Sequence, residues 1–258
     1  MKRLAVMTTH RVEAVEGALR QVEERAGSAG LELVPPESGD ADLVLVLGGD
    51  GTMLRALRAT LGAGTPVFGL NFGRVGFLTS AAGAELGTAL DRVLAGDFRV
   101  IELSTLAARI AGEGHAAIND VVVTSARPGR MVELGWEIGG EQLGEQPCDG
   151  MICCTPSGST AYNLSNGGPV MMWGLEAMAM TFVAPHSLHA RPVVVPRGLE
   201  LRITSRAAEM PVTVLVDGHE VGGLEDGAAL EVGVGDETCS LALLPEVTFF
   251  SRYHDVFP

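Results

Sequence analysis

Lysine is almost absent from this chain of 258 residues, whose 18 basic residues are 17 arginines and Lys2. The phosphate-binding loop GxxxxGK[ST] needs a lysine beside its hydroxyl residue, and no such motif occurs. Schiff-base catalysis needs a lysine inside the fold, and the chain has no interior lysine. Both classes of mechanism are therefore excluded.

Basic charge as a whole is also scarce. The 18 basic residues stand against 32 acidic ones, which gives a formal net charge of −14 and a pI near 4.8. Proteins that bind nucleic acid or anionic membranes present basic surfaces. We therefore expect neither partner, and we expect any anionic ligand to be held by backbone amides, a few arginines or a bridging cation.

Cysteines and long apolar runs are few. Cys148, Cys153, Cys154 and Cys239 form no CxxC pair, and we expect them to be buried free thiols in a reducing compartment. No apolar run reaches about 18 residues, and the opening MKRLAVMTTHR contains only a short one, unlike a signal peptide. We expect a cytoplasmic protein.

The first part of the chain alternates buried strands with amphipathic helices. The predicted strands are Leu4–Thr9, Leu43–Leu47 and Thr65–Asn71. The predicted helices run from Val12 to Ala26, ended by Gly27, from Met53 to Leu61, closed by Gly62 and Gly64, and from Glu85 to Leu94. This rhythm predicts a Rossmann-like, three-layer α/β domain with its ligands at the carboxyl ends of the strands.

Near Phe98 the pattern changes to short alternating strands separated by glycine, asparagine and proline turns. We predict an all-β sandwich over residues 98–239. The α/β domain then covers residues 1–97, joined by the C-terminal segment 240–258.

The segment GGDGT at 48–52 follows a buried strand. Asp-Gly is a favoured hairpin turn, but Met53, Leu54, Leu57 and Leu61 continue with helical spacing. The segment therefore joins a strand to a helix N-terminus, where unpaired amides form an anion site. Thr52 can cap the helix or offer its hydroxyl, and Arg55 can reach an anion from the next turn.

Asp50 is out of place beside an anion unless it handles a proton or a metal. Either task fits phosphoryl transfer, in which a carboxylate orients or deprotonates the attacking hydroxyl and Mg²⁺ offsets phosphate charge. The alternative, that Asp50 only caps the helix, stays open.

A second polar loop covers Cys148 to Pro169 and is dense in glycine, serine, threonine and asparagine around Tyr162. We expect it to present backbone amides and hydroxyls to a polar ligand. Asn119 and Asp120 precede a valine-rich strand, and alone they would be interpreted as a turn.

Together these segments resemble the NAD kinases. The matching motifs are GGDGT at 48–52, NFGRVGF at 71–77, IND at 118–120, DGMICCTPSGSTAYNLSNGGP at 149–169 and PHSLHARPVVVP at 185–196. The resemblance implies transfer of the terminal phosphoryl group of ATP or polyphosphate to the 2′-hydroxyl of the adenosine ribose of NAD, giving NADP. It also implies Mg²⁺ or another divalent cation on the donor phosphates rather than in a protein cage, and a homodimer or homotetramer.

The resemblance assigns roles to individual residues. Asp50 matches the catalytic aspartate, proposed as the base toward the ribose hydroxyl. The matching binding residues are Gly49, Gly51, Thr52, Arg55, Phe77, Asn119, Asp120, Arg130, Asp149, Thr160, Ala161, Tyr162, Ser165 and His219. Phe77 would line the adenine side, and the ring of Tyr162 is suited to stack on a base.

Three positions depart from the family pattern. Asp120 stands where glutamate is common, Pro147 where some relatives carry arginine, and Phe72 where a smaller residue is usual. Two alternatives remain: a kinase for another hydroxyl substrate, such as a lipid, and a dinucleotide sensor that has lost turnover.

Overall fold

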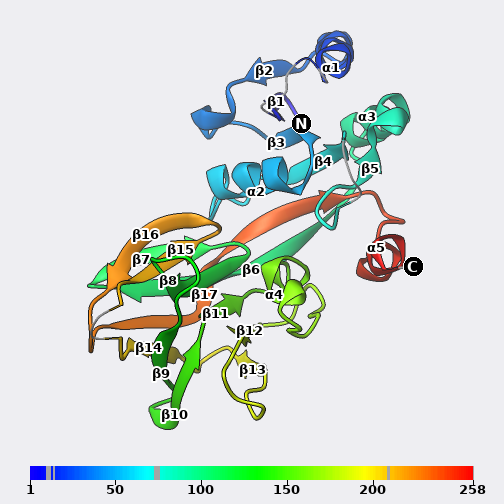
Figure 1. Ribbon diagram of the computed structural model, residues 1–258. Helices are drawn as coiled ribbons and strands as arrows, with labels where there is room; N and C mark the ends of the chain where they lie inside the picture. The colour runs from blue at the N-terminus through cyan, green and yellow to red at the C-terminus, as the bar shows by residue number, and fades with distance from the viewer. Residues whose placement is uncertain (10–12, 14, 73–75, 208–209, 258) are drawn as a thin grey trace. The chain divides into compact units, whose positions relative to one another are not determined.

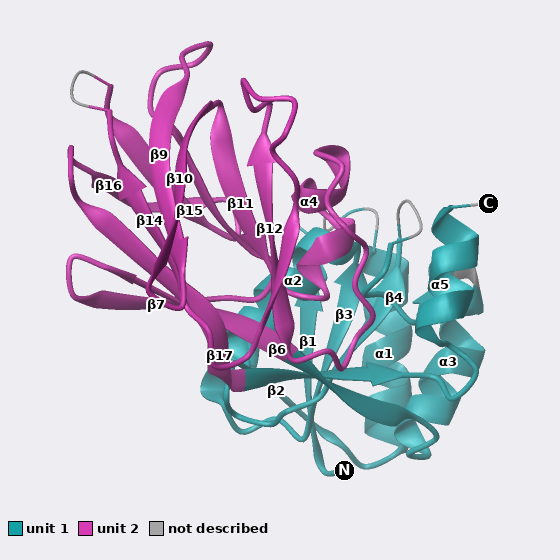
Figure 2. Cartoon of the chain, turned by 90° about the horizontal axis from the view of Figure 1, so that it is seen from below, with its two compact units in different colours: residues 1–103, 238–258 teal, residues 104–237 magenta. Residues whose placement is uncertain are grey.

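The computed structural model describes residues 1–9, 13, 15–72, 76–207 and 210–257, and the chain divides into two units. Unit 1 comprises Met1–Leu103 and Thr238–Pro258, and unit 2 comprises Ser104–Glu237 (Figure 2). Two long strands, β6 (Arg99–Ile110) and β17 (Ala229–Leu243), contribute to both units.

Unit 1 is built on parallel strands in the order β2-β1-β3-β4-β17 (Figure 1). Its strands are β1 (Arg3–Thr8), β2 (Glu32–Val34), β3 (Leu43–Gly48), β4 (Val67–Asn71) and β5 (Ala81–Ala82). Its helices are α1 (Glu16–Ser28), α2 (Asp50–Ala59), α3 (Leu86–Leu94) and α5 (Phe249–Val256), with 3₁₀ turns η2 (Pro36–Ser38) and η3 (Gly83–Glu85).

Strand β3 is buried along its whole length, as expected for a parallel strand covered by helices on both faces. Helices α1 and α3 lie together, joined by Arg25 and Asp91 at 3.0 Å, whereas α2 packs on β3 and β4. The predicted three-layer α/β architecture is confirmed.

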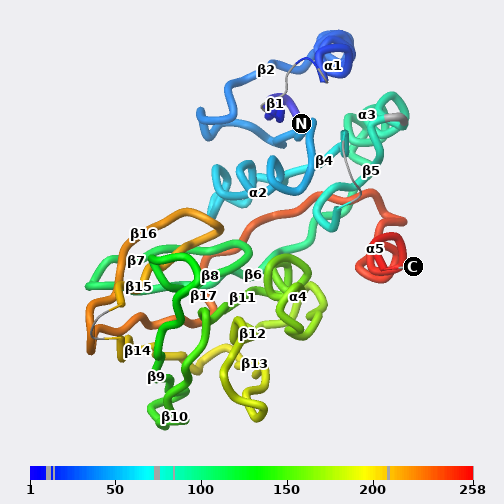
Figure 3. Tube along the Cα trace, in the orientation of Figure 1, coloured from blue at the N-terminus to red at the C-terminus, as the bar shows by residue number. Residues whose placement is uncertain are grey.

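The C-terminal segment belongs to unit 1. Figure 3 shows α5 near α3 and β5. Arg92 of α3 donates to both carboxylate oxygens of Glu246, at 2.5 and 3.0 Å, and Arg99 donates to the Val247 carbonyl at 2.6 Å. Helix α5 begins with a capping box between Thr248 and Ser251.

Helix boundaries differ in part from the sequence prediction. Helix α1 continues through Gly27 to Ser28, because a glycine inside a helix carries a modest cost that packing can offset. Val12, the predicted start, lies outside the described residues, as do positions 73–75 of the NFGRVGF motif. Helix α2 begins at Asp50 itself, so that Gly51 and Thr52 belong to its first turn.

Unit 2 is a sandwich of two sheets, which confirms the predicted all-β fold. One sheet has the order β13-β12-β11-β8-β15-β16, and the other contains β10-β9-β14-β17 with β6 and β7. The strands are β7 (Glu113–Ala117), β8 (Asp120–Ser125), β9 (Val132–Ile138), β10 (Glu141–Cys148), β11 (Gly150–Cys154), β12 (Ala177–Val183), β13 (Val193–Pro196), β14 (Leu201–Ser205), β15 (Val212–Val216) and β16 (His219–Leu224).

The core of unit 2 lies between these sheets and includes Val121, Met151, Met180, Leu201 and Ile203. A smaller cluster with Ile152 and Cys154 covers the opposite face of the first sheet. The strands β8 and β11 are therefore buried on both faces, which explains their unbroken apolar sequences.

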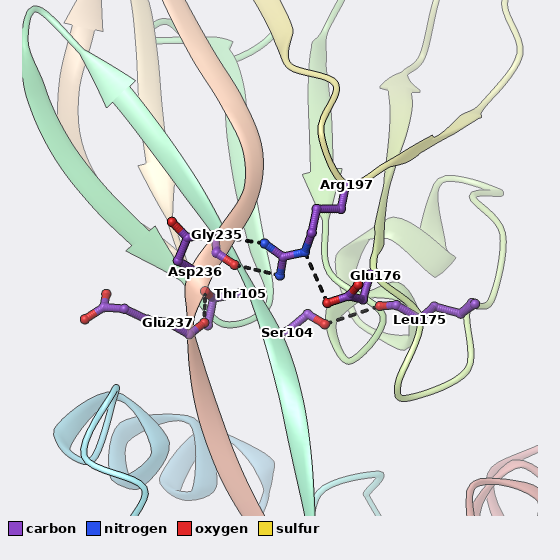
Figure 4. A network of polar contacts seen from close by, with 8 residues as sticks. All are labelled: Ser104, Thr105, Leu175, Glu176, Arg197, Gly235, Asp236 and Glu237. Carbon is purple, nitrogen blue, oxygen red and sulfur yellow. Dashed lines mark hydrogen bonds and ion pairs between the residues drawn. The ribbon is translucent and has the colours of Figure 1, made fainter.

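A polar network ties the connection after β13 to β17 (Figure 4). Arg197 donates to Glu176 at 3.2 Å, to Asp236 at 3.3 Å and to the Gly235 carbonyl at 3.0 Å. Thr105 of β6 donates to the Glu237 carbonyl at 2.6 Å. These bonds join segments of both sheets at one end of the sandwich.

Within the part of the chain that the structure describes, every helix is too short or too polar to cross a membrane.

Candidate functional site

Asp50 is the first residue of α2, directly after the buried strand β3 and Gly49. Its Oδ2 accepts a hydrogen bond from the Phe77 amide at 2.9 Å, and its Oδ1 accepts one from the Leu78 amide at 3.2 Å. The helix has no side-chain cap. Asp50 is therefore held by a distant loop and does not act as the cap of its own helix.

The environment of Asp50 shifts its acidity. Burial raises the pKa of this carboxyl above its usual range, and the amides of Phe77 and Leu78 and the charge of Arg252 oppose that shift. Arg252 lies on α5 and is itself buried, and its Nε has no hydrogen-bond partner among the described residues. Sequence reasoning missed Arg252, because 202 positions separate it from Asp50.

At two glycines beside Asp50 and Thr52, the space that a β-carbon would need is already filled. A β-carbon at Gly76 would overlap the Asp50 carboxylate, and one at Gly48 would lie 2.6 Å from the Thr52 hydroxyl oxygen. Thr52 is buried, so its side chain packs beneath the first turn and does not cap the helix. Gly51 and Arg55 lie exposed on the same helix.

The ring of Phe77 is buried against other aromatics. Its centroid lies 6.0 Å from that of Phe249 and 5.7 Å from that of Phe257. The group of Phe77 that contacts Asp50 is the backbone amide. Phe72, one of the departures, lies against Gly83, where a β-carbon would be 2.7 Å from the Phe72 ring.

In unit 2, Asn119 and Asp120 lie where the chain enters β8. The carboxylate of Asp217, in the turn between β15 and β16, accepts hydrogen bonds from the amides of Ile118 at 3.0 Å, Asn119 at 2.7 Å and Asp120 at 3.1 Å. His219 Nδ1 lies 3.1 Å from the Asp217 carbonyl oxygen. The fold thus brings three predicted site residues, Asn119, Asp120 and His219, to one turn.

Asp120 is 7% exposed, and this burial disfavours the charged form of its carboxyl group. Burial, and secondarily the charge of Asp217, raises its pKa from 3.8 to about 6. Asn119 Oδ1 is buried and has no hydrogen-bond partner among the described residues. No donor of the described chain reaches this oxygen, which is the arrangement expected where a ligand supplies the donor.

The loop after β11 is buried rather than a surface loop. The Thr155 and Ser157 hydroxyls donate to the Ile118 carbonyl, at 2.6 and 3.0 Å, and the Ser159 hydroxyl donates to the Pro156 carbonyl at 2.7 Å. We expected these hydroxyls to face a ligand, and the structure uses all three to build the loop. A β-carbon at Gly158 would overlap the Asn119 carbonyl oxygen.

Asn163 anchors the rest of that loop. It is fully buried, donates to the Ser159 and Pro169 carbonyls at 3.1 and 3.0 Å, and accepts from the Thr181 hydroxyl at 2.7 Å. The surrounding elements are the turn η4 (Gly158–Thr160) and the short helix α4 (Tyr162–Ser165). Tyr162 and Ser165 remain exposed, and Ala161 is half-buried.

The two remaining predicted residues are exposed in connections of unit 2. Arg130 lies between β8 and β9, and Asp149 lies between β10 and β11, where its carbonyl accepts from the Thr124 hydroxyl at 2.8 Å. Neither has a described hydrogen bond to Asn119. Pro147 lies in β10, and its carbonyl accepts from the His186 amide at 2.9 Å.

A cavity of about 650 Å³ in unit 2 involves none of the predicted residues. Four glutamates and two arginines line it, and both arginines, Arg109 and Arg202, pair with Glu231 at 3.0 and 2.8 Å. An acidic lining of this kind disfavours phosphate, so the cavity does not suit a dinucleotide.

Among the described residues, no group of three or more histidine, cysteine, aspartate or glutamate side chains is placed to hold a metal ion. The oxygens of Asp50 each accept only one described amide bond and keep a further lone pair. A divalent cation carried on donor phosphates is compatible with this arrangement.

Comparisons with known proteins cover nearly the whole chain. The ATP-NAD kinase N-terminal domain matches residues 5–98, and the ATP-NAD kinase C-terminal domain matches residues 118–244. The NAD kinase of Heliobacterium modesticaldum is 40% identical over 214 residues, which cover 81% of this chain and 76% of that protein. The NAD kinase of Symbiobacterium thermophilum is 36% identical over 249 residues, covering 93% and 88%.

Solved structures agree. An NAD kinase from Archaeoglobus fulgidus in complex with ATP has a TM-score of 0.79 and 25% identity, covering 98% of this chain and 99% of that one. Yeast NADH kinase complexed with NADH shares the fold, with a TM-score of 0.86 at 21% identity over 98% of this chain and 86% of that one. The chain belongs to the NAD kinase family.

Proposed function

We propose that this protein transfers the terminal phosphoryl group of ATP, or of polyphosphate, to the 2′-hydroxyl of the adenosine ribose of NAD, producing NADP. The observation that carries the proposal is the carboxylate of Asp50, fixed by two amides at the start of α2 in a chain of the NAD kinase family.

Asp50 acts as the general base. The 2′-oxygen attacks the terminal phosphorus, the bond from that phosphorus to the leaving oxygen of the donor breaks, and the hydroxyl proton passes to Asp50. The amides of Phe77 and Leu78 hold the carboxylate in one orientation. Burial raises the pKa of Asp50, which makes it a better proton acceptor, and the amides of Phe77 and Leu78 and the charge of Arg252 oppose that rise.

The start of α2 serves the phosphates. Amides of a helix N-terminus favour negative charge, and Gly49, Gly51 and Thr52 provide a backbone that phosphate can approach. Arg55, exposed one turn later, supplies a cation. When bound, a divalent cation on the donor phosphates neutralises their charge.

Unit 2 supplies NAD recognition. Asn119 and Asp120 contact the ribose and base, and the buried Oδ1 of Asn119 accepts a hydrogen bond from the ligand. The exposed ring of Tyr162 stacks on a base, with Thr160, Ala161 and Ser165 beside it. Arg130, Asp149 and His219 complete the proposed contacts of unit 2, and Phe77 is a proposed contact from unit 1. We further propose residues 1–97 with 240–258, and residues 98–239, as the two domains.

We also propose a cytoplasmic homodimer or homotetramer. All four cysteines are free and buried, as expected in a reducing compartment. Leu188, 90% exposed in the PHSLHARP segment, is a surface that a second copy would cover. Light scattering of the purified protein tests the assembly, and a monomer at micromolar concentration would contradict it.

The function is tested by incubating the purified protein with NAD and Mg²⁺, adding ATP in one reaction and polyphosphate in another. An NADP-specific dehydrogenase reports the product, and a diacylglycerol acceptor replaces NAD in a third reaction. We expect NADP in at least one of the first two. Phosphorylation of the lipid alone would favour the other kinase class, and NAD binding without product would indicate a sensor.

A further inference from the structure

The turn between β15 and β16 exchanges hydrogen bonds with residues 118–120, the segment that contains Asn119, and each of the two segments donates to the other. Asp217 accepts hydrogen bonds from the three consecutive amides of residues 118–120, at 2.7–3.1 Å. In return, the Asp217 amide donates to the Asp120 carbonyl at 2.9 Å. Four hydrogen bonds therefore connect one turn to one three-residue segment that lies about 100 positions earlier in the chain.

Three successive amides that converge on one point form a concave anion site. The protein fills this site with its own carboxylate, which makes the bonds charge-assisted and stronger than those between neutral groups. Asp217 has a φ of 47°, a conformation that aspartate, asparagine and glycine tolerate better than other residues. Both the charge and the backbone of this residue suit its position.

The other edge of the same segment is held by carbonyl contacts. The Ile118 carbonyl accepts from the Thr155 and Ser157 hydroxyls, and the Asn119 carbonyl accepts from the Thr155 amide at 2.9 Å. With its amides and carbonyls both engaged, the backbone of Asn119 has one orientation. Its side-chain Oδ1 is buried and has no hydrogen-bond partner in the described chain.

Holding the segment this way has an electrostatic cost. The Asp217 carboxylate lies close enough to Asp120 that its charge adds to burial in raising the pKa of Asp120. Cys154 of β11 pairs with Asp120 of β8, and the charge of Asp120 adds to burial in raising the pKa of Cys153 and Cys154. His219 Nδ1 lies 3.1 Å from the Asp217 carbonyl oxygen. A neutral residue at position 217 would relieve this repulsion, but it would also weaken the three amide bonds that hold residues 118–120.

We propose that Asp217 is a positioning residue for dinucleotide recognition, whose carboxylate fixes the backbone of residues 118–120 so that Asn119 meets the ligand in one orientation. The inference rests on the proposed NAD-binding role of Asn119. Asp217 acts through Asn119, and it need not touch the ligand.

The test compares Asp217→Asn and Asp217→Gly with the exposed Asp226→Asn as a control of equal charge change. Asparagine and glycine both suit the left-handed backbone, so folding is preserved and thermal unfolding checks it. Both variants at position 217 lose the charge-assisted bonds to the amides of residues 118–120, so we expect NAD binding to weaken roughly 10- to 100-fold. We expect kcat and the KM for ATP to change by less than about threefold. Asp226→Asn leaves all three unchanged.

A double-mutant cycle with Asn119→Ala separates positioning from general damage. In the Asn119→Ala protein, Asp217→Asn should weaken NAD binding by less than about threefold further. Full additivity of the two losses would overturn the proposal.

Hydrogen exchange gives a readout that does not depend on turnover. Exchange of the Ile118 and Asn119 amides should accelerate at least tenfold in Asp217→Asn, and unchanged exchange would also overturn the proposal. If the wild-type protein makes no NADP, the proposed function fails, while the exchange result still decides whether Asp217 holds the loop.

Discussion

Helix α2 and strand β8 each begin with a buried or partly buried aspartate, Asp50 and Asp120, and the surroundings of the two carboxyl groups affect their charge differently. Asp50 receives two backbone amides and the field of Arg252, which oppose the effect of burial on its pKa. Asp120 is buried beside the carboxylate of Asp217, and both influences raise its pKa, to about 6.

The difference indicates two kinds of function. A general base accepts a proton in its ionised form, and for Asp50 two amides and Arg252 favour that form although burial raises the pKa overall. Asp120 lies in a segment whose three amides already donate to Asp217. The nearby Asp217 carboxylate disfavours the charged form of Asp120. Such local instability is typical of ligand-binding segments, where stability is lost for function.

Asp50→Asn should have the largest effect. Loss of a general base lowers kcat by roughly 10²- to 10⁴-fold, and NAD binding should change by less than about threefold, because the amide keeps a similar shape. Steady-state kinetics and calorimetric titration with NAD measure the two effects. The exposed Asp40→Asn serves as the control, and equal kcat values for Asp50→Asn and wild type would rule out the base.

Asp120→Asn tests whether the buried charge of Asp120 lowers the free energy of unfolding as the pH rises. The folded pKa of about 6 lies above the usual 3.8, so the folded state binds more protons between these values and its stability falls as pH rises. Asparagine removes that fall, and the difference in unfolding free energy between variant and wild type should grow by about 3 kcal/mol from pH 3 to 7.

Urea unfolding at each pH measures this difference. A difference that stays constant across the range would contradict the assignment of the shift to Asp120. NAD binding should meanwhile weaken, since the variant loses a proposed ligand contact.

Gly158→Ala should displace the backbone of the segment that leads into β8, at Asn119. The added methyl group would overlap the Asn119 carbonyl oxygen, so we expect a loss of roughly 1–3 kcal/mol in stability, together with weaker NAD binding. Gly114→Ala, whose methyl group meets nothing within 4 Å, is the matched control. Denaturant melts compare the two, and equal stabilities would show that the contact relaxes freely.

Gly27→Ala should have the smallest effect, and in the opposite direction. Gly27 lies inside α1 with open space around a β-carbon, so alanine should stabilise unit 1 by about 0.5–1 kcal/mol. The measurement is the same denaturant melt, with kcat expected to stay unchanged. A loss of stability would mean that the helix is not continuous through this glycine.

Local sequence patterns predicted the parts of the fold that depend on local periodicity. The unbroken run Leu43–Leu47 and the helical spacing after Met53 predicted β3 and α2, and with them the position of Asp50. Strand β10 carries no such local signal, because it is an edge strand, largely exposed and without an apolar alternation.

The partners of the site residues could not be predicted in the same way. Leu78, Arg252 and Asp217 reach Asp50 or Asp120 from distant parts of the chain, and only the tertiary fold brings them close. Nothing in the local sequence indicated that the Asp217 carboxylate binds the amides of residues 118–120. The motif resemblance located the candidate residues without revealing what holds them.

The most direct test of the account is the position of the new phosphate in the product, together with its dependence on Asp50. NAD is incubated with Mg²⁺ and the donor that supports turnover, and the product is examined by ³¹P and ¹H NMR. We expect a phosphate on the 2′-oxygen of the adenosine ribose with wild type and almost none with Asp50→Asn. A phosphate elsewhere, or the same 2′ product from both proteins at equal rates, would contradict it.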